Sequence, residues 1–186
     1  MSDRPLDSRY GPPSGETAVL VAVQSGLAAP PVVSAARTLS HFGEHAAGWV
    51  GVAALGAALS RRRRRDMLLV GAGALAAHAA AIAIKLVVRR ARPDHPAVAV
   101  NAATPSALSF PSAHATSSTA AAMLLCRATG SRLPLVLIPV MALSRLVLGV
   151  HYPTDVLAGI VVGASVAGTA SRLAGPRKET PSADPR

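Results

Sequence analysis

Cysteine is almost absent from this 186-residue chain, in which Cys126 is the only one. A single cysteine can form no intrachain disulfide, and it excludes a metal site built from several cysteines. Charged residues are scarce as well, at 15% of the chain, whereas soluble domains average about 25%. Hydrophobic residues make up 51%. The chain therefore lacks the polar surface that a soluble domain of this length presents to water.

Aromatic residues are also few, at 3%. Acidic residues are outnumbered by basic ones, with nine aspartates and glutamates against 19 lysines and arginines. The net charge of +10 would suit a nucleic-acid-binding protein, but such proteins carry basic surfaces, often with aromatic residues on which bases stack. Here five charges form the block RRRRR at 61–65, between two apolar runs. Basic residues beside apolar runs are typical of membrane spans. We expect no nucleic-acid partner.

The long apolar runs predict an all-α, polytopic membrane protein. A span needs about 20 predominantly apolar residues. We predict a transmembrane domain over residues 41–174, with a bundle of five spans. These spans cover residues 42–60, 67–88, 114–127, 133–150 and 156–174. The abundant alanine and glycine would let the helices approach one another closely.

The two ends of the chain are more polar. Residues 1–40 combine a polar start with a segment, 16–40, that is broken by Gly26 and by Pro30-Pro31. This pattern predicts short helices at the membrane interface, with a sixth span as the alternative. Residues 175–186 are polar, and we expect a disordered tail.

The distribution of basic residues predicts the orientation in the membrane. Six further basic residues fall on the same side as the RRRRR block, which gives that side 11 against seven on the other: Arg127, Arg132, Arg172, Arg177, Lys178 and Arg186. The more basic side is normally cytoplasmic. We therefore expect a multi-pass protein of the plasma membrane with the block inside. The cations from Lys85 to Arg92 then lie on the extracytoplasmic face.

Three polar motifs fall on that face, and the first is KLVVRRARP at 85–93. Lys85 and Arg92 are seven residues apart and would share one helix face if the helix continues that far. Taken alone, the motif is more often a basic flank that reaches the headgroups of the lipid than a binding site.

The second motif is PSAH at 111–114. Ser112 is a natural N-cap for the following helix, whose free N–H groups and positive dipole end favour an anion. Taken alone, the motif is also typical of an ordinary capped helix start.

The third motif, SRLVLGVHYPTD at 144–155, puts ionisable residues into an apolar run. Ionisable residues at membrane depth are costly and usually mark a functional site. Gly149 and Pro153 indicate a break between two spans, so Asp155 falls in the first helical turn after it, close enough to hold a nitrogen of His151. A structural cap pair is the alternative for these two residues, and an in-helix hydrogen bond is the alternative for Ser144. We expect His78, in mid-span, to be a packed, hydrogen-bonded histidine.

Together the motifs predict a site for a multiply charged, tetrahedral anion. Lys85, Arg92 and Arg145 supply charge, and the helix start at Ser112 supplies N–H groups. Two histidines can provide a nucleophile and an acid, as phosphoryl transfer requires. No cluster of carboxylates is present to hold Mg²⁺, and we expect neither a metal nor another cofactor.

The patterns K-x6-RP, PSxH and SR-x5-H-x3-D resemble the three signature motifs of the type 2 phosphatidic acid phosphatase superfamily. The resemblance implies a metal-independent lipid phosphate phosphatase, a phosphoric monoester hydrolase. It implies that phosphate is held by Lys85, Arg92, Ser112, the N–H of Ala113 and Arg145. It further implies a nucleophile, His151, an orienting carboxylate, Asp155, and a general acid, His114. Ala113 departs from the family pattern, which usually has glycine there, and we expect activity to be retained.

Three further stretches, SHFGEH (40–45), RPDHPA (92–97) and SFPSAHATS (109–117), resemble an actinobacterial branch of this superfamily. Its members convert decaprenylphosphoryl-5-phosphoribose to decaprenylphosphoryl ribose, a precursor of cell-wall arabinan. The resemblance implies a polyprenyl-phosphate lipid as substrate. Possible head-group contacts in the 94–110 loop are Asp94, His95 and Asn101.

Other functions remain open from the sequence. Within the same chemistry, the substrate could be a polyprenyl diphosphate or phosphatidylglycerophosphate. A protein of another class, such as a transporter or a non-catalytic anion-binding membrane protein, would also use cations. Such a protein needs neither His114 nor His151, and a transporter would often show inverted repeats, which the sequence lacks.

Overall fold

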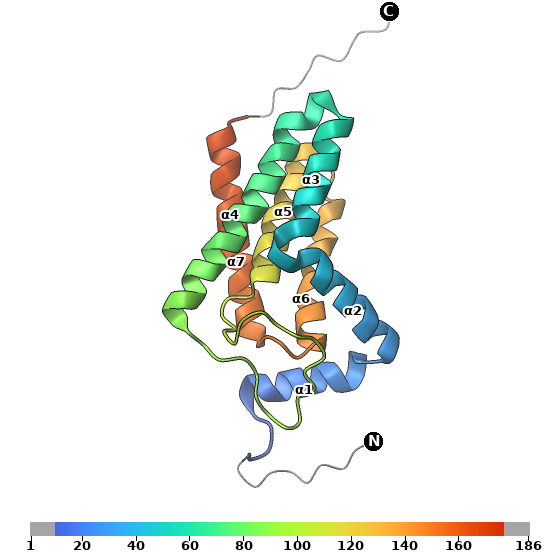
Figure 1. Ribbon diagram of the computed structural model, residues 1–186, viewed down its shortest axis with the longest axis vertical. Coiled ribbons are helices and arrows are strands. Elements are labelled where there is room, and N and C mark those ends of the chain that lie inside the picture. The colour runs from blue at the N-terminus through green and yellow to red at the C-terminus, as the bar shows by residue number, and fades with distance from the viewer. Residues whose placement is uncertain (1–9, 177–186) are drawn as a thin grey trace, which may run out of the picture.

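The computed structural model describes residues 10–176, and these residues form helices joined by loops, without a β-strand (Figure 1). The helices, in chain order, are α1 (Gly15–Leu27), α2 (Pro30–Gly43), η1 (Glu44–Ala46), α3 (Ala47–Leu59), η2 (Arg61–Arg63), α4 (Arg64–Val88), α5 (Ala113–Thr129), η3 (Leu133–Val136), α6 (Leu137–Val147) and α7 (Pro153–Ala174). The predicted all-α fold is confirmed. The predicted tail falls largely on 177–186, outside the described residues.

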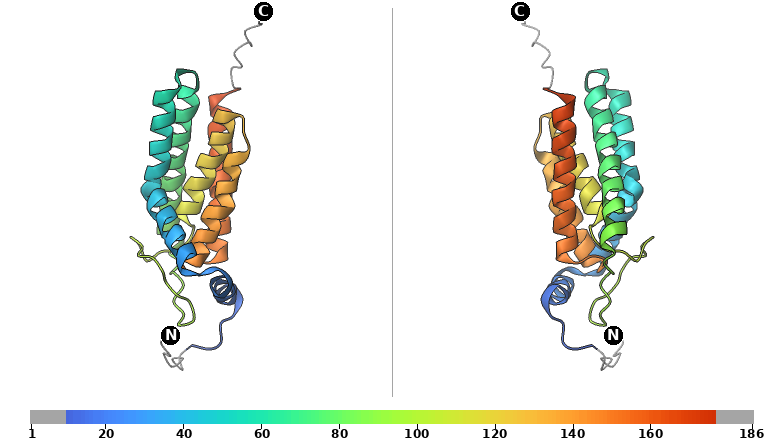
Figure 2. Two further views of the ribbon diagram at one scale, coloured as in Figure 1. Left: turned by 90° about the vertical axis from the view of Figure 1, so that its right-hand side faces the viewer. Right: turned by 90° about the vertical axis from the view of Figure 1, so that its left-hand side faces the viewer.

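The helices α3 to α7 run lengthwise as a bundle, with α5 at its centre (Figures 1 and 2). Twelve of the 17 residues of α5 are buried, and most of them are alanine, serine or threonine. These small side chains allow the surrounding helices to pack closely against α5. The indole Nε1 of Trp49 donates a 3.0 Å hydrogen bond to Ser118 Oγ and ties α3 to this central helix.

Two glycines bring α7 against the backbone of α5. A Cβ atom on Gly159 would lie 2.7 Å from the carbonyl oxygen of Ser112, and one on Gly163 would lie closer still to that of Thr116. The two glycines are four residues apart and therefore lie on one face of α7. Their lack of side chains holds the start of α5 beside the start of α7, and so two of the three motifs are neighbours.

Two helical segments, Arg61–Val88 and Pro153–Ala174, are long and apolar enough to cross a membrane. A third is possible if α1 and the segment Pro30–Leu59, which meet at a 116° bend, count as one broken span; Leu133–Val147 is apolar but shorter. The predicted number of five spans is not confirmed by these criteria. α5 does not meet them, and its serines and threonines are buried inside the bundle, where they need not face lipid.

The surfaces of α4 and α7 carry the apolar side chains that a membrane protein requires. Their exposed members include Leu68, Leu75, Leu86, Leu157 and Val161. Exposed apolar side chains over the length of long helices are typical of contact with lipid.

The amino-terminal segment forms two short helices that break at Ala28 and Ala29, just before Pro30-Pro31, as predicted. α1 lies crosswise beneath the lower end of the bundle, while α2 rises from it toward α3 (Figures 1 and 2). The crosswise orientation of α1 agrees with the predicted helix at the membrane interface. The division of the chain into domains at 40 and 174 stays a prediction.

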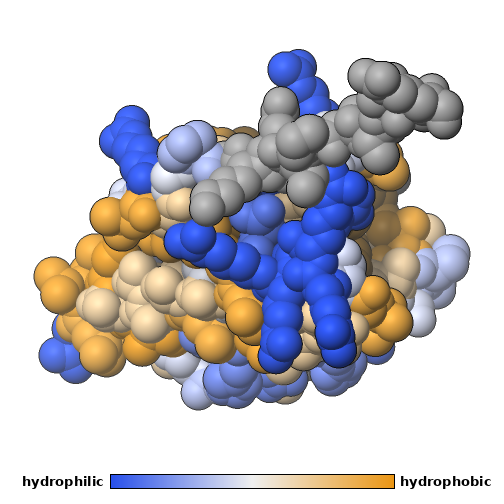
Figure 3. Space-filling view, turned by 90° about the horizontal axis from the view of Figure 1, so that it is seen from above, coloured by the Kyte–Doolittle hydropathy of each residue, from blue (hydrophilic) through white to orange (hydrophobic). Residues whose placement is uncertain are grey.

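The opposite, upper end of the bundle carries the RRRRR block. Strongly hydrophilic side chains gather over this end, with apolar residues around them (Figure 3). Arg61, Arg62, Arg63, Arg64 and Arg65 are all exposed. The three polar motifs lie at the lower end, so the basic block and the motifs occupy opposite ends of the molecule.

Candidate active site

The three motifs meet around one cavity of about 920 Å³ near the lower end of the bundle. Its walls come from α2, η1, α4, the start of α5, the end of α6, the loop from 89 to 112 and the loop between α6 and α7. Of the residues expected at the site, those that line the cavity are Lys85, Arg92, Asn101, Ala113, His114, Arg145 and His151. The tertiary structure therefore unites residues that are up to 66 positions apart in the sequence.

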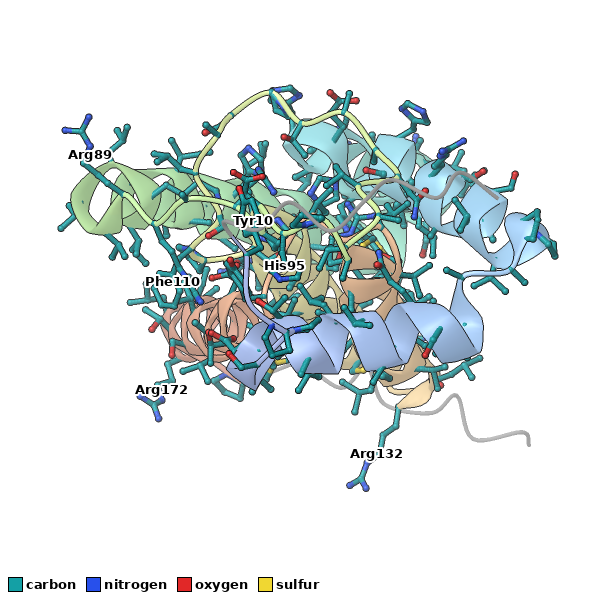
Figure 4. All side chains as sticks on the ribbon, turned by 90° about the horizontal axis from the view of Figure 1, so that it is seen from below. Tyr10, Arg89, His95, Phe110, Arg132 and Arg172 are labelled. Carbon is teal, nitrogen blue, oxygen red and sulfur yellow. The ribbon has the colours of Figure 1, made fainter. Side chains whose placement is uncertain are left out.

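Lys85 and Arg92 reach the cavity from different elements, which corrects the expectation that they share a helix face. α4 ends at Val88, and Arg89 adopts a left-handed conformation with φ 53° that turns the chain into the loop. The Arg89 side chain points away from the bundle (Figure 4). Lys85 is buried, and its Nζ donates to the carbonyl oxygens of Leu108 (3.1 Å) and Ser109 (2.9 Å).

Arg92 projects into the cavity from the loop. Its Nε donates a 2.8 Å hydrogen bond to the carbonyl oxygen of Ser106, and its Nη1 donates to that of Val150 and lies 3.3 Å from His151 Nε2. Burial lowers the pKa of Arg92, an effect that the charge of Asp155 partly offsets. An arginine remains cationic under such a shift.

Arg145 comes from α6 and is 2% exposed. Its three nitrogens donate to Ser144 Oγ (3.1 Å), Ser40 Oγ (3.0 Å) and the carbonyl oxygen of Ala36 (3.3 Å). Ser40 was not foreseen from the sequence, since serine in a helix gives no signal of such a contact.

The three cations share one property: within residues 10–176, none of them has a carboxylate at ion-pair distance. The ion pairs found there involve other arginines and histidines. A buried charge without a counterion is costly, and a bound anion removes that cost. Lys85, Arg92 and Arg145 therefore form a cage that is suited to a multiply charged anion.

His151 lies in the loop between α6 and α7 and is 3% exposed. Its Nε2 faces Arg92, while its Nδ1 lies 3.6 Å from Asp155 Oδ2 and has no hydrogen-bond partner in the described part of the chain. That distance is just beyond a hydrogen bond, and catalytic contacts of this kind often shorten when substrate binds. Burial lowers the pKa of His151 to about 4, so the ring is neutral near pH 7 and Nε2 can act as a nucleophile.

Asp155 is fully buried behind His151 and is held from two sides. Its Oδ2 accepts the backbone N–H of Tyr152 (2.8 Å), and its Oδ1 accepts a hydrogen bond from Arg90 Nη1 (2.8 Å). Arg90 also donates to Glu16 of α1. The sequence contains Arg90 within the first motif, but nothing there distinguishes it from Arg89.

The PSAH motif forms the start of α5, as predicted. Ser112 is buried and caps the helix by accepting the N–H of Ala115 (3.4 Å), so its side chain does not line the cavity. Ala113 does, and the N–H groups of the first helical turn have no intrahelical acceptor. His114 Nε2 lies 3.0 Å from the carbonyl oxygen of Ser40. A carbonyl can only accept, so this nitrogen carries a proton.

Only one of the three possible head-group contacts lies at the cavity. Asn101 lines the cavity, but Asp94 and His95 do not. His95 Nε2 instead lies 3.1 Å from the carbonyl oxygen of Gly11, and its ring meets Tyr10 edge-on (Figure 4). His78, expected to be hydrogen-bonded, lines the cavity, and its Nδ1 has no partner among residues 10–176.

An apolar helical bundle whose cavity is lined by three cations and two histidines is the arrangement expected of a membrane protein that binds a phosphate group and reacts with it. The chain matches the PAP2 superfamily over residues 66–179. It belongs to this superfamily, in agreement with the three motifs.

Relatives with assigned activities are closely similar. The decaprenylphosphoryl-5-phosphoribose phosphatase of Mycobacterium tuberculosis (strain H37Rv) is 60% identical over 167 residues, which cover 89% of this chain and 94% of that protein. The enzyme of the same name from Mycolicibacterium smegmatis is 66% identical over 148 residues, 79% of this chain and 82% of its own. A crystal structure of a PAP2-type phosphatidylglycerolphosphate phosphatase from Bacillus subtilis shares the fold, with a TM-score of 0.68 at 20% identity over 87% of this chain and 88% of that one.

Proposed function

We propose that this protein is a membrane phosphatase that removes the 5-phosphate from decaprenylphosphoryl-5-phosphoribose and leaves decaprenylphosphoryl ribose. The observation that carries the proposal is the cage of three cations, two of them buried, that have no carboxylate partner within residues 10–176, together with two histidines that line the same cavity. The cage accounts for binding of the phosphate group. The histidines account for its transfer.

The reaction begins with attack of His151 Nε2 on the phosphorus. A bond forms between this nitrogen and phosphorus while the bond to the 5-oxygen of the sugar breaks. His114 acts as an imidazolium, whose charge the bound phosphate neutralises, and it gives a proton to the departing oxygen. In the second step, water attacks the phosphohistidine, His114 accepts a proton from that water, and inorganic phosphate leaves.

The remaining residues stabilise charge and geometry. Transfer of a phosphoryl group relies mainly on positioning and on charges directed at its equatorial oxygens. Lys85, Arg92 and Arg145 supply those charges, with the N–H of Ala113 at the helix start. Asp155 keeps the proton of His151 on Nδ1 and stabilises the cationic ring of the phosphohistidine, and no step in this sequence requires a metal.

Identity of 60–66% to two phosphatases of decaprenylphosphoryl-5-phosphoribose supports the choice of substrate. The apolar outer surface of the bundle is suited to contact with lipid, and a polyprenyl chain would lie in the same lipid. We further propose that the site opens to the extracytoplasmic face, because the cavity lies at the end opposite the RRRRR block, and such blocks favour the cytoplasm.

The test is phosphate release by the purified protein in detergent with EDTA present. Decaprenylphosphoryl-5-phosphoribose, undecaprenyl diphosphate and phosphatidylglycerophosphate are offered side by side, with His151→Ala as the inactive control. Release from the phosphoribosyl lipid by the wild type alone supports the proposal. Preference for another lipid would replace the substrate and keep the mechanism, whereas a need for a divalent metal would overturn the mechanism.

A further inference from the structure

The cavity contains a fourth cation, Arg37, that none of the three motifs includes. Arg37 lies on α2, lines the cavity and is exposed at its rim. No carboxylate of the described chain lies at ion-pair distance from it, and Glu44, the acidic residue in the cavity wall, is instead 3.9 Å from His41. The caged phosphate already has three cations, so Arg37 is free to bind a second anionic group.

α2 places Arg37 beside the phosphate cage but outside it. Ser40 lies at the edge of the cage, because its carbonyl oxygen contacts His114 and its hydroxyl oxygen contacts Arg145. Arg37 precedes Ser40 by three residues, about 4.5 Å along the helix axis, toward the start of α2 and the lower end of the molecule. A ligand that reaches from the cage to Arg37 therefore has two negative groups joined by a short linker.

The loop fixes the Arg37 guanidinium in a defined orientation. Its Nε donates a 2.7 Å hydrogen bond to the carbonyl oxygen of Asn101. Asn101 is itself held in place, because its backbone N–H donates a 2.9 Å hydrogen bond to the carbonyl oxygen of Leu148. Both terminal nitrogens of Arg37 remain without a partner in the described part of the chain. A guanidinium held in this way presents two parallel N–H donors, which match two oxygens of a phosphate group.

We propose that Arg37, oriented by the carbonyl oxygen of Asn101, forms a second anion subsite, which binds the lipid phosphodiester of the substrate. The inference rests on the proposed function, because decaprenylphosphoryl-5-phosphoribose carries a monoester at one end of its ribose and a diester at the other. With the monoester in the cage, the ribose spans the gap and the diester lies at the rim, where the lipid chain leaves for the membrane. Arg37 then selects lipids with a second phosphate at this spacing.

The experiment separates the two subsites by inhibition. Turnover of substrate labelled with ³²P at the 5-phosphate is measured with decaprenylphosphoryl ribose, which has only the diester, and with inorganic phosphate, which fits only the cage. We expect Arg37→Gln to raise the inhibition constant of decaprenylphosphoryl ribose about 10-fold, as loss of a charge-assisted contact implies. The constant for inorganic phosphate should stay within about 2-fold.

Arg89→Gln is the matched control, since it removes the same charge from the same end of the molecule at a side chain that points away from the bundle (Figure 4). It should change neither constant. Equal changes in both constants for Arg37→Gln would mean that Arg37 only anchors the loop, and unchanged constants would mean that it binds nothing; either result overturns the subsite. If the wild type does not cleave the phosphoribosyl lipid, the proposed function itself fails, and the subsite with it.

Discussion

Arg90 Nη1 donates a 2.8 Å hydrogen bond to Asp155 Oδ1, the oxygen of that carboxylate that does not face His151. The same nitrogen also donates to Thr154 Oγ1 (2.7 Å), and the other terminal nitrogen donates to Glu16 of α1. Arg90 thus links the helix beneath the bundle to Asp155, which we propose orients the nucleophile. It does not line the cavity, so we expect it to affect catalysis only through Asp155.

Arg90→Gln should lower kcat about 10- to 100-fold while KM changes less than about 3-fold. The reason is that the carboxylate loses a charge-assisted hydrogen bond worth about 1.5–3 kcal/mol, without loss of a contact to substrate. Arg90→Lys should recover part of the rate. Steady-state kinetics of both variants beside Arg89→Gln would measure this, and a change in KM alone would argue against a positioning role.

Gly43→Ala should reduce kcat/KM at least about 10-fold. A Cβ atom at Gly43 would lie 2.6 Å from His114 Cδ2, so the imidazole must move away from the leaving oxygen, and small misplacements of catalytic groups are costly. Gly51→Ala is the control, because a Cβ there meets nothing within 4 Å. Equal activity of the two variants would show that His114 tolerates displacement.

The His151 ring should remain neutral down to about pH 4, because burial lowers its pKa to about 4. In the unfolded chain the same ring titrates near 6.5. Between these values the unfolded state binds a proton that the folded state does not, so stability should fall as the pH drops from about 6.5 to about 4. Histidine ring ¹⁵N shifts, assigned with His151→Gln, would report the titration, and a midpoint near 6.5 would contradict it.

Inorganic phosphate should raise the melting temperature of the wild type but not of Arg145→Met. A ligand that binds only the folded state stabilises a protein by RT ln(1 + [L]/Kd), and Arg145 is the most deeply buried of the three caged cations. Thermal unfolding in detergent, with and without phosphate in an otherwise identical buffer, would measure the shift in melting temperature. An equal shift in both proteins would mean that phosphate binds elsewhere.

Ala113→Gly should leave kcat/KM within about 3-fold of the wild type. Ala113 lines the cavity, but phosphate is expected to contact its N–H, which both residues possess, and glycine only widens the wall. A loss beyond 10-fold would indicate that the methyl group helps to position the phosphate.

Two local contacts of the candidate site could be predicted from the sequence, whereas the roles of its residues were implied by the resemblance to a family. The Ser112 cap and the approach of Asp155 to His151 span three and four residues, distances that helix geometry fixes. The same reasoning was wrong for Lys85 and Arg92, because it assumed that α4 continues beyond Val88. The left-handed conformation of Arg89, which ends the helix there, has no signal in a run of arginines.

The sequence by itself determined that this chain forms an apolar helical bundle, since its hydrophobic balance permits little else, and which cations and histidines are available for phosphate. Only the tertiary structure decided which further residues join them. Ser40 and Arg37 reach the cavity because α2 leans against α6, and His95 stays outside because the loop carries it to Gly11. Contacts within a helical turn follow from the backbone, whereas contacts between distant segments depend on packing angles and loop paths, which no short stretch of sequence encodes.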